Sequence, residues 1–233
     1  MLEQNCEKKP KKYAGILAHP TSFPSPYGIG DLGPGAYQFI DFLAASGMNV
    51  WQVLPLGHTG FGDSPYQPFS AFAGQPLIID IDDLKEKKLL IDEDFEDMPK
   101  WDPQKIEYGD LIEFKTGLLK KAYERFTDED YSDDMSSDAE LMKEYNSFIK
   151  NTEWLADYSL FMAGKDTHQG MPWYMWEDSL KNPTARQKTT WRKKLAPEVG
   201  YYNFIQFLFS KQWQSLKTLS LIHISEPTRL RCI

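Results

Sequence analysis

A nearly continuous apolar run, MNVWQVLPL at residues 48–56, limits the folds that this chain can adopt. Because its apolar residues do not alternate with polar ones, the run is typical of a parallel strand covered on both faces. Residues 14–18, within YAGILAHPTSF, form a second short apolar segment, which we interpret as a buried strand. Between them, apolar residues recur at helical spacing ahead of a terminating glycine: Ala36, Phe39, Ile40 and Leu43, then Gly47. Strand, helix and strand in this order predict a βαβ unit and an α/β fold.

The pattern becomes helical at about residue 85 and remains so to about residue 195. Acidic segments at residues 92–99 and 127–140 separate the helical stretches, and we interpret them as solvated surface rather than metal sites. Three apolar stripes are expected to face the core: Leu111, Phe114, Leu118 and Ala122 behind Asp110 as a cap; Leu155, Tyr158, Phe161 and Met162; and, further along, Tyr202, Ile205, Phe209, Trp213 and Leu216. We therefore expect a helical insertion, about residues 85–195, in an α/β domain.

The acidic composition argues against nucleic acid as a partner. The chain has 26 Lys and Arg residues against 34 Asp and Glu residues, a formal net charge of -8, and negative charge repels a phosphate backbone. No apolar stretch approaches the roughly 20 residues that cross a membrane, and no signal segment is visible at the N-terminus. Cys6 and Cys232 give no disulfide framework, which fits a reducing compartment. We therefore expect a cytoplasmic protein.

A glycine-rich segment, GHTGFGDSPYQPFSAFAG at residues 57–74, follows the second strand. It contains too much glycine and proline for a helix or a central strand, so we expect a loop whose backbone can approach a ligand closely. Within it Tyr66 offers a flat ring and a hydroxyl, and Asp63 and Ser64 offer short polar side chains. Such a mixture of apolar and hydrogen-bonding surface suits a carbohydrate.

Residues 51–80 and residues 16–33, ILAHPTSFPSPYGIGDLG, resemble the N-terminal part of the 4-α-glucanotransferases, also called amylomaltases or disproportionating enzymes, of glycoside hydrolase family 77. Residues 157–173 and 201–217 resemble the family in the same order. The resemblance implies an incomplete (β/α)₈ TIM barrel with a helical insertion. It also implies transfer of a segment of an α-1,4-glucan to glucose or a maltooligosaccharide by retaining double displacement, without a cofactor.

The same resemblance implies that Ser64 and Tyr66 line the substrate cleft. We interpret Asp63 as a residue that fixes the loop, with direct substrate contact as the alternative. Trp173 and Trp176 could face either substrate or core, and we retain Trp173 as a lesser candidate for substrate binding.

Other conspicuous side chains are interpreted as architectural. His19 is expected beneath the pocket and His168 in a loop, and no required chemical role is expected for His58. The aromatic residues expected in the core are Phe39, Trp51 and Phe72. In some family members tyrosines at the position of Phe61 and near that of Ile112 bind a second glucan chain, and this sequence lacks both hydroxyls.

We assign no catalytic residue. Retaining transfer needs two carboxyl groups about 5 to 5.5 Å apart, and the resemblance implies that both lie on later strands, beyond the position of Lys217. Asp31, Asp63 and Asp80 each have a structural reason to be acidic. With only two clear core strands before the insertion, we expect the chain to be inactive and poorly soluble.

Residues 219–233, LSLIHISEPTRLRCI, do not continue the preceding pattern. They closely resemble the translation of a sequencing-library adapter, so we expect residues 1–218 to be the N-terminal part of a catalytic barrel and the remainder to be a non-native tail. The alternative is a genuine, divergent tail.

Two other functions stay open. One is a glucan-binding module in which Tyr66, Trp173 and Trp176 stack on sugar without chemistry. The other is a hydrolase of the α-amylase clan, which would only shorten glucans, whereas a transferase makes both longer and shorter products.

Overall fold

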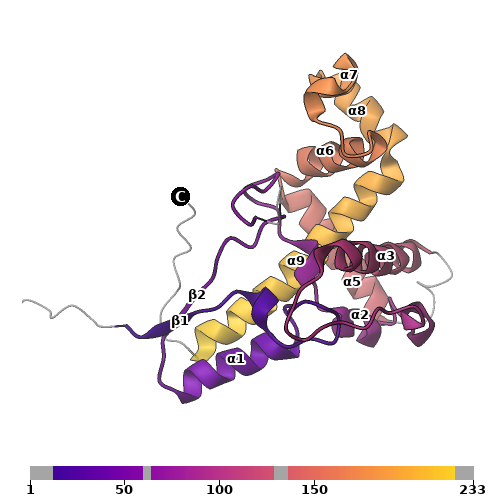
Figure 1. The fold of residues 1–233 in the computed structure, drawn as a ribbon. Helices are drawn as coiled ribbons and strands as arrows, with labels where there is room; N and C mark the ends of the chain where they lie inside the picture. The colour runs from indigo at the N-terminus through magenta and orange to yellow at the C-terminus, as the bar shows by residue number, and fades with distance from the viewer. Residues whose placement is uncertain (1–12, 60–63, 129–135, 224–233) are drawn as a thin grey trace, which may run out of the picture.

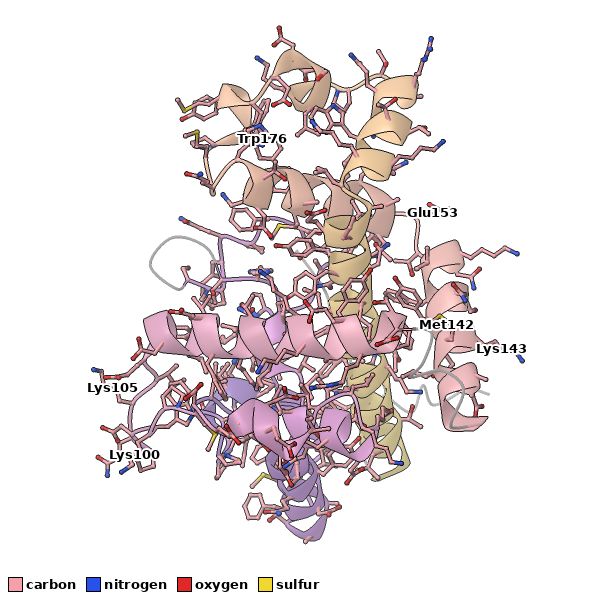
Figure 2. All side chains as sticks on the ribbon, turned by 90° about the vertical axis from the view of Figure 1, so that its right-hand side faces the viewer. Lys100, Lys105, Met142, Lys143, Glu153 and Trp176 are labelled. Atoms are coloured by element: carbon pink, nitrogen blue, oxygen red, sulfur yellow. The ribbon has the colours of Figure 1, made fainter. Side chains whose placement is uncertain are left out.

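The computed structural model describes residues 13–59, 64–128 and 136–223. Helix α9 (Ala196–His223) runs diagonally through the molecule and contacts several helices, most of which are far from it in sequence (Figure 1). Its partners are α1 (Pro34–Ala45), α3 (Tyr108–Thr127), α5 (Ser136–Asn151), α6 (Leu155–Thr167) and α8 (Ala185–Lys194). Seen from the side, α3 crosses α9, and α6 to α8 lie at one end of it (Figure 2). The chain is therefore a mostly helical α/β structure built on α9.

The predicted βαβ unit is confirmed. Strand β1 (Gly15–Leu17) pairs in parallel with β2 (Val50–Gln52), and Ile16 is opposite Trp51. Helix α1 connects the two strands. Within the described residues these two strands form the whole sheet.

Helix α1 begins and ends as its sequence predicts. Pro34 is the first helical residue, where its missing N–H costs nothing. At the other end Gly47 adopts a φ of 67°, in the left-handed region. This turn lets the amide of Met48 donate to the carbonyl of Leu43 at 3.0 Å, and that of Gly47 to Ala44 at 3.1 Å. The helix then buries Ala36, Ile40 and Leu43.

The predicted burial of the strands is wrong. Leu17 is 57% exposed, and Val50 and Trp51 are only half-buried. A parallel strand loses water from both faces only where further elements cover both sides. Here Trp51 packs against Trp213 of α9, while the side chain of Leu17 has no such cover within the described residues.

The chain is mostly helical after the glycine-rich loop, as the helical pattern from about residue 85 predicted. Besides α3, α5, α6 and α8 it contains α2 (Ile81–Glu86), α7 (Asp178–Lys181) and short 3₁₀ turns at Pro76–Ile78 (η3), Asp92–Phe95 (η4) and Trp173–Met175 (η5), with another at Pro20–Ser22 (η1). The buried members of the predicted stripes are Leu111, Leu118, Ala122, Leu155, Tyr158, Met162, Tyr202, Ile205, Phe209 and Leu216. The prediction of Asp110 as the cap of α3 is wrong, because Glu107 occupies the N-cap position. Asp110 lies in the first turn, where its negative charge interacts favourably with the helix dipole.

Helix α9 extends to His223, past the boundary expected at Thr218. Residues 224–233 lie outside the described residues, so the non-native origin of the tail stays a prediction. In the described part of the chain, no helix is both long enough and apolar enough to span a membrane.

Asp31 and Asp80 have the structural roles that the sequence suggested. Asp31 is buried and accepts hydrogen bonds from the hydroxyl of Ser25 (2.8 Å) and the amide of Gly33 (3.1 Å). Asp80 caps α2 by accepting from the amide of Asp82 at 3.0 Å. Burial, together with the nearby charge of Asp31, raises the pKa of Asp80 to about 6.

Lys115, inside α3, is fully buried. Its ammonium group donates to the carbonyls of Leu77 (2.8 Å) and Ile79 (3.2 Å), so it ties α3 to η3. Burial lowers the pKa of Lys115 to about 8, while the charges of Asp31 and Asp80 oppose this shift. At neutral pH the lysine therefore carries the charge that balances these carboxylates.

We predict that Lys115→Met lowers the free energy of unfolding by about 3 kcal/mol, because it leaves two carbonyls without a donor and the carboxylates without their counter-charge. Urea denaturation followed by far-UV circular dichroism measures this. Lys120→Met, at an exposed position on the same helix, is the control. Equal midpoints for the two variants would contradict the prediction.

A second prediction concerns pH. A carboxyl group whose pKa is higher in the folded than in the unfolded chain favours folding at low pH, and this contribution disappears as the pH rises from about 4 to about 6. Asparagine also caps helices but stays neutral. Asp80→Asn should therefore gain stability relative to the parent chain between pH 4 and pH 7, on the order of 1 kcal/mol. A difference in unfolding free energy that does not change with pH would show that Asp80 titrates normally.

Candidate functional site

The glycine-rich loop is closed at its base. Gly57 and Gly74 form an isolated antiparallel bridge, and the amide of Gln75 donates to the carbonyl of Leu56 at 2.8 Å. The loop therefore starts and ends at one point, just after β2. Residues 60–63, which include Phe61 and Asp63, lie outside the described residues, so the interpretations of these two side chains stay predictions.

Ser64 and Tyr66 lie together on the outer part of this loop. The amide of Tyr66 donates to the hydroxyl oxygen of Ser64 at 3.3 Å. The Tyr66 side chain is 67% exposed, so its ring and hydroxyl are available to a ligand. Neither residue lines the cavity that lies behind the loop.

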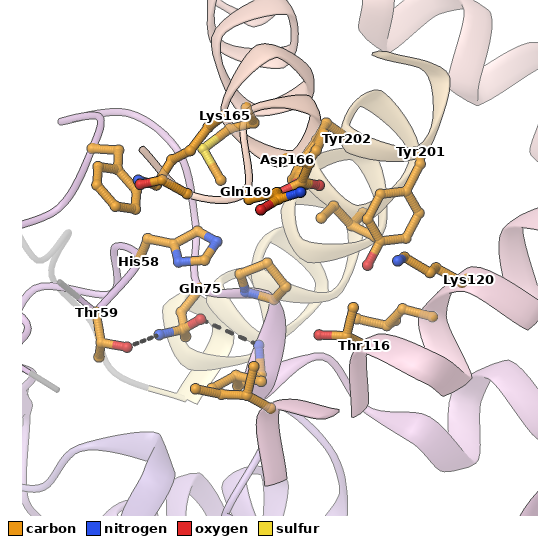
Figure 3. Close-up of a pocket in the computed structure, with 18 residues that line it drawn as sticks. His58, Thr59, Gln75, Thr116, Lys120, Lys165, Asp166, Gln169, Tyr201 and Tyr202 are labelled. Atoms are coloured by element: carbon orange, nitrogen blue, oxygen red, sulfur yellow. Dashed lines mark hydrogen bonds between the residues drawn. The ribbon is translucent and has the colours of Figure 1, made fainter. Parts of the chain in front are cut away.

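A cavity of about 500 Å³ lies between part of the loop and the helices (Figure 3). The loop contributes His58, Thr59 and Phe69, and the opposite walls come from η3, α3, α6 and α9. The other lining residues are Gln75, Pro76, Leu77, Ile112, Thr116, Leu119, Lys120, Met162, Lys165, Asp166, Gln169, Gly170, Tyr201, Tyr202 and Ile205. Hydroxyl, amide and charged groups thus surround a partly apolar space, which suits a polyhydroxylated ligand.

Several polar groups of the cavity are already fixed by hydrogen bonds. Tyr202 donates its hydroxyl to Asp166 at 2.6 Å, and the side-chain amide of Gln75 donates to the hydroxyl of Thr59 at 3.2 Å (Figure 3). Burial lowers the pKa of His58, against the opposing charge of Asp166, so this imidazole is neutral at pH 7. Lys165 places its ammonium group 5.0 Å from the centre of the Phe69 ring.

The cavity has an incomplete set of groups for retaining chemistry among the described residues that line it. Asp166 is the one carboxylate among the described residues that line it, whereas retaining transfer uses two. Asp166 also accepts the hydroxyl of Tyr202, which orients it as part of the wall. Ile112 lines the cavity and is 43% exposed.

Trp173 belongs to a second, smaller cavity. This space of about 300 Å³ is lined by Asp157, Leu160, Phe161, Trp173, Trp176, Leu180, Lys181, Pro183 and Lys188. The two cavities lie on different faces of α6, because the lining residues 157, 160 and 161 are offset on average by roughly 140° around the helix from residues 162, 165 and 166. Trp173 is 51% exposed, whereas Trp176 is 5% exposed.

Trp176 and His168 are architectural. The indole N–H of Trp176 donates to the carbonyl of Met171 at 3.1 Å, and the imidazole of His168 stacks on the indole at 5.1 Å between ring centres. His168 also lies 2.6 Å from a carboxylate oxygen of Glu177 and 2.6 Å from the carbonyl of Gly164. These contacts fold the segment between α6 and α7.

His19 does not line either cavity. Its Nδ1 lies 2.8 Å from the hydroxyl of Thr21, and burial lowers the pKa of the imidazole.

The prediction that Phe72 belongs to the core is wrong, because this ring is 71% exposed and stacks on Trp154 with 6.1 Å between ring centres. The loop carries Phe72 outward, away from the buried residues that follow it.

The sequence did not reveal most of the cavity wall. Thr116, Lys165 and Asp166 lie on the polar sides of their helices, where a sequence pattern indicates only solvent. Gln75 directly follows the glycine-rich segment, and in the sequence only this position indicated that it could belong to the site. Tyr202 was predicted as a core residue, and its hydroxyl additionally reaches Asp166.

The fold and the site together indicate the class of protein to which this chain belongs. A mostly helical α/β chain with a small parallel sheet, and a partly polar cavity beside the loop that follows a strand, fits part of a TIM-barrel enzyme. The sequence model of glycoside hydrolase family 77, described as 4-alpha-glucanotransferase, matches residues 18–221. The chain belongs to this family, which confirms the resemblance.

Curated relatives agree. A 4-alpha-glucanotransferase of Synechocystis sp. is 41% identical over 218 residues, which are 93% of this chain and 40% of the relative. One of Thermus thermophilus is 41% identical over 203 residues, 87% of this chain and 39% of the relative. Among solved structures, the amylomaltase of Streptococcus agalactiae in complex with acarbose gives a TM-score of 0.81 at 32% identity, over 91% of this chain and 42% of that one. The chain thus spans about two fifths of the length of these relatives.

Proposed function

We propose that this chain supplies glucan-binding surface to a 4-α-glucanotransferase, which moves a segment of an α-1,4-glucan donor to glucose or to another α-1,4-glucan. The observation that carries the proposal is the family match over residues 18–221. The name of the Streptococcus agalactiae structure, an amylomaltase in complex with acarbose, supports a carbohydrate ligand.

In this proposal β1 and β2 are strands of an incomplete TIM barrel, and the segment from about residue 85 to about residue 195 is an insertion. The glycine-rich loop follows the C-terminal end of β2, and loops at this end of barrel strands build the active sites of TIM-barrel enzymes. Ser64 and Tyr66 then contact the sugar near the bond that is broken, and Asp63 fixes the loop. The exposed Tyr66 ring suits stacking on a sugar face, with its hydroxyl as a hydrogen-bond partner.

The residues of this chain bind and orient the glucan, and they exclude water from it. Retaining double displacement passes through a covalent glucosyl intermediate, and an acceptor hydroxyl must reach this intermediate before water does. The cavity behind the loop, with one carboxylate among the described residues that line it, fits the binding part of this task. We therefore propose that the chain alone is inactive. A cytoplasmic location remains a prediction from its cysteine content.

The test of the function is calorimetric titration of the chain with maltoheptaose, together with an assay for glucose released from maltotriose. We expect saturable binding without glucose release. Products both longer and shorter than maltotriose would show a transferase already complete in this chain, and products that are only shorter would indicate a hydrolase. Absence of binding would refute the proposed role.

We predict that Tyr66→Ala weakens maltoheptaose binding about tenfold, because stacking of one ring on a sugar contributes on the order of 1.4 kcal/mol. Tyr66→Phe separates the ring from the hydroxyl and should retain most of the affinity. Phe42→Ala, at a 51% exposed aromatic position on α1, is the control and should bind as the parent chain does. Equal affinities for Tyr66→Ala and Phe42→Ala would exclude Tyr66 from the site.

We also propose that Trp173 contacts glucan, on a different face of α6 from the larger cavity. Its half-exposed indole adjoins an apolar cavity with the charged groups of Asp157 and Lys188 at its edge. Trp173→Ala should reduce retention on amylose in affinity electrophoresis, whereas Trp173→Phe should preserve part of it. Unchanged retention of Trp173→Ala would remove this residue from the proposal.

A further inference from the structure

The backbone of Gly74 needs hydrogen-bond partners from outside its loop. The hydrogen bond from Gln75 to Leu56 flanks the Gly57–Gly74 pair, so in this antiparallel bridge the N–H and C=O of Gly74 point away from Gly57. Gly74 is buried, so these two groups cannot be left to water.

Gln206 of α9 supplies both partners. Its Oε1 accepts from the amide of Gly74 at 2.8 Å, and its Nε2 donates to the carbonyl of Gly74 at 2.9 Å. The side-chain amide thus takes the place of a peptide group of a neighbouring strand, and it is 1% exposed. The approach is close, because a Cβ added to Gly74 would lie 2.1 Å from the ring of Phe209. The base of the loop therefore lies directly on α9.

Gln212 repeats this arrangement further along α9. Its Oε1 accepts from the amide of Asp80 at 2.8 Å, and its Nε2 donates to the carbonyl of Asp80 at 3.2 Å. Gln206 and Gln212 are as far apart in sequence as Gly74 and Asp80, so residues 74–80 follow α9 and are held at both ends. Gln212 holds the start of α2, whereas Gln206 holds the end of the glycine-rich loop.

We propose that Gln206 is a positioning residue for the glucan site. It fixes the base of the loop that carries Ser64 and Tyr66, so that the loop does not have to be ordered by the ligand. The inference rests on the proposed function of this loop. The reason is entropic: a glycine-rich and proline-rich loop samples many conformations unless its ends are held, and ordering it on binding would reduce affinity.

The experiment compares Gln206→Met with Gln212→Met, which removes the matching pair of backbone bonds outside the loop and one bond to Asp83. Amide hydrogen exchange of residues 64–74 and calorimetric titration with maltoheptaose are measured for both variants, with thermal midpoints as the measure of general destabilisation. We expect both midpoints to fall. We expect only Gln206→Met to accelerate exchange in the loop and to weaken binding about tenfold.

Loop exchange and affinity that change equally in the two variants would overturn the proposal, and so would a Gln206→Met variant that keeps both parent values. If Gln206→Met does not fold, the parent chain still provides a test. The amide of Gly74 should then exchange as slowly as the amides in the middle of α9, and exchange as fast as that of exposed loop amides would overturn the proposal. Failure of the parent chain to bind maltoheptaose would refute the proposed function, while the exchange data would still report on Gln206.

Discussion

Helix α9 must bury side chains around almost its whole circumference, and the rest of the structure depends on this requirement. All residues from Phe204 to Phe209 are buried, so this middle stretch of the helix has no face that could remain in water. The chain buries these side chains by packing α1, α3, α5 and α6 around α9. Segments far apart in sequence thereby meet on one helix, and both cavities lie in the helical layer assembled around it.

Polar groups buried in this packing determine which segments meet. An apolar helix surface alone tolerates small shifts of its neighbours, because dispersion contacts are not directional. Gln206 and Gln212 remove that freedom, since each pairs with both the N–H and the C=O of one residue. Lys115 acts in the same way from α3 by donating to two carbonyls of the same segment. A shift of one residue would leave several of these buried groups without partners, at about 1 to 3 kcal/mol each.

The sequence predicted elements whose signals are local. The βαβ unit, the end of α1 at Gly47 and the buried stripes of the later helices follow from periodicity and from conformational preferences of single residues. Burial of β1 and β2 was predicted wrongly, because it depends on which other elements cover the sheet. The burial of Phe72 was predicted wrongly for a related reason: an aromatic residue in a loop belongs to no periodic pattern that would indicate which way it faces. For the candidate site, the glycine-rich motif indicated the loop. The cavity wall, however, comes from α3, α6 and α9, and no single segment carries a sequence pattern that indicates it.

The geometry of the glycine-rich loop therefore depends more on helices than on the sheet that precedes it. Its base is tied to α9 through Gln206, and its inner side faces α3, α6 and α9 across the cavity. The strands are short and partly exposed, so they constrain the loop only through the residues that connect it to β2. A change in α9 that shifts Gln206 would thus move the loop even with β2 in place, whereas fraying of β1 would leave the contact between Gly74 and Gln206 intact. In this arrangement the surface proposed to receive the sugar is held separately from the strands, so the proposed glucan binding depends on the helical core.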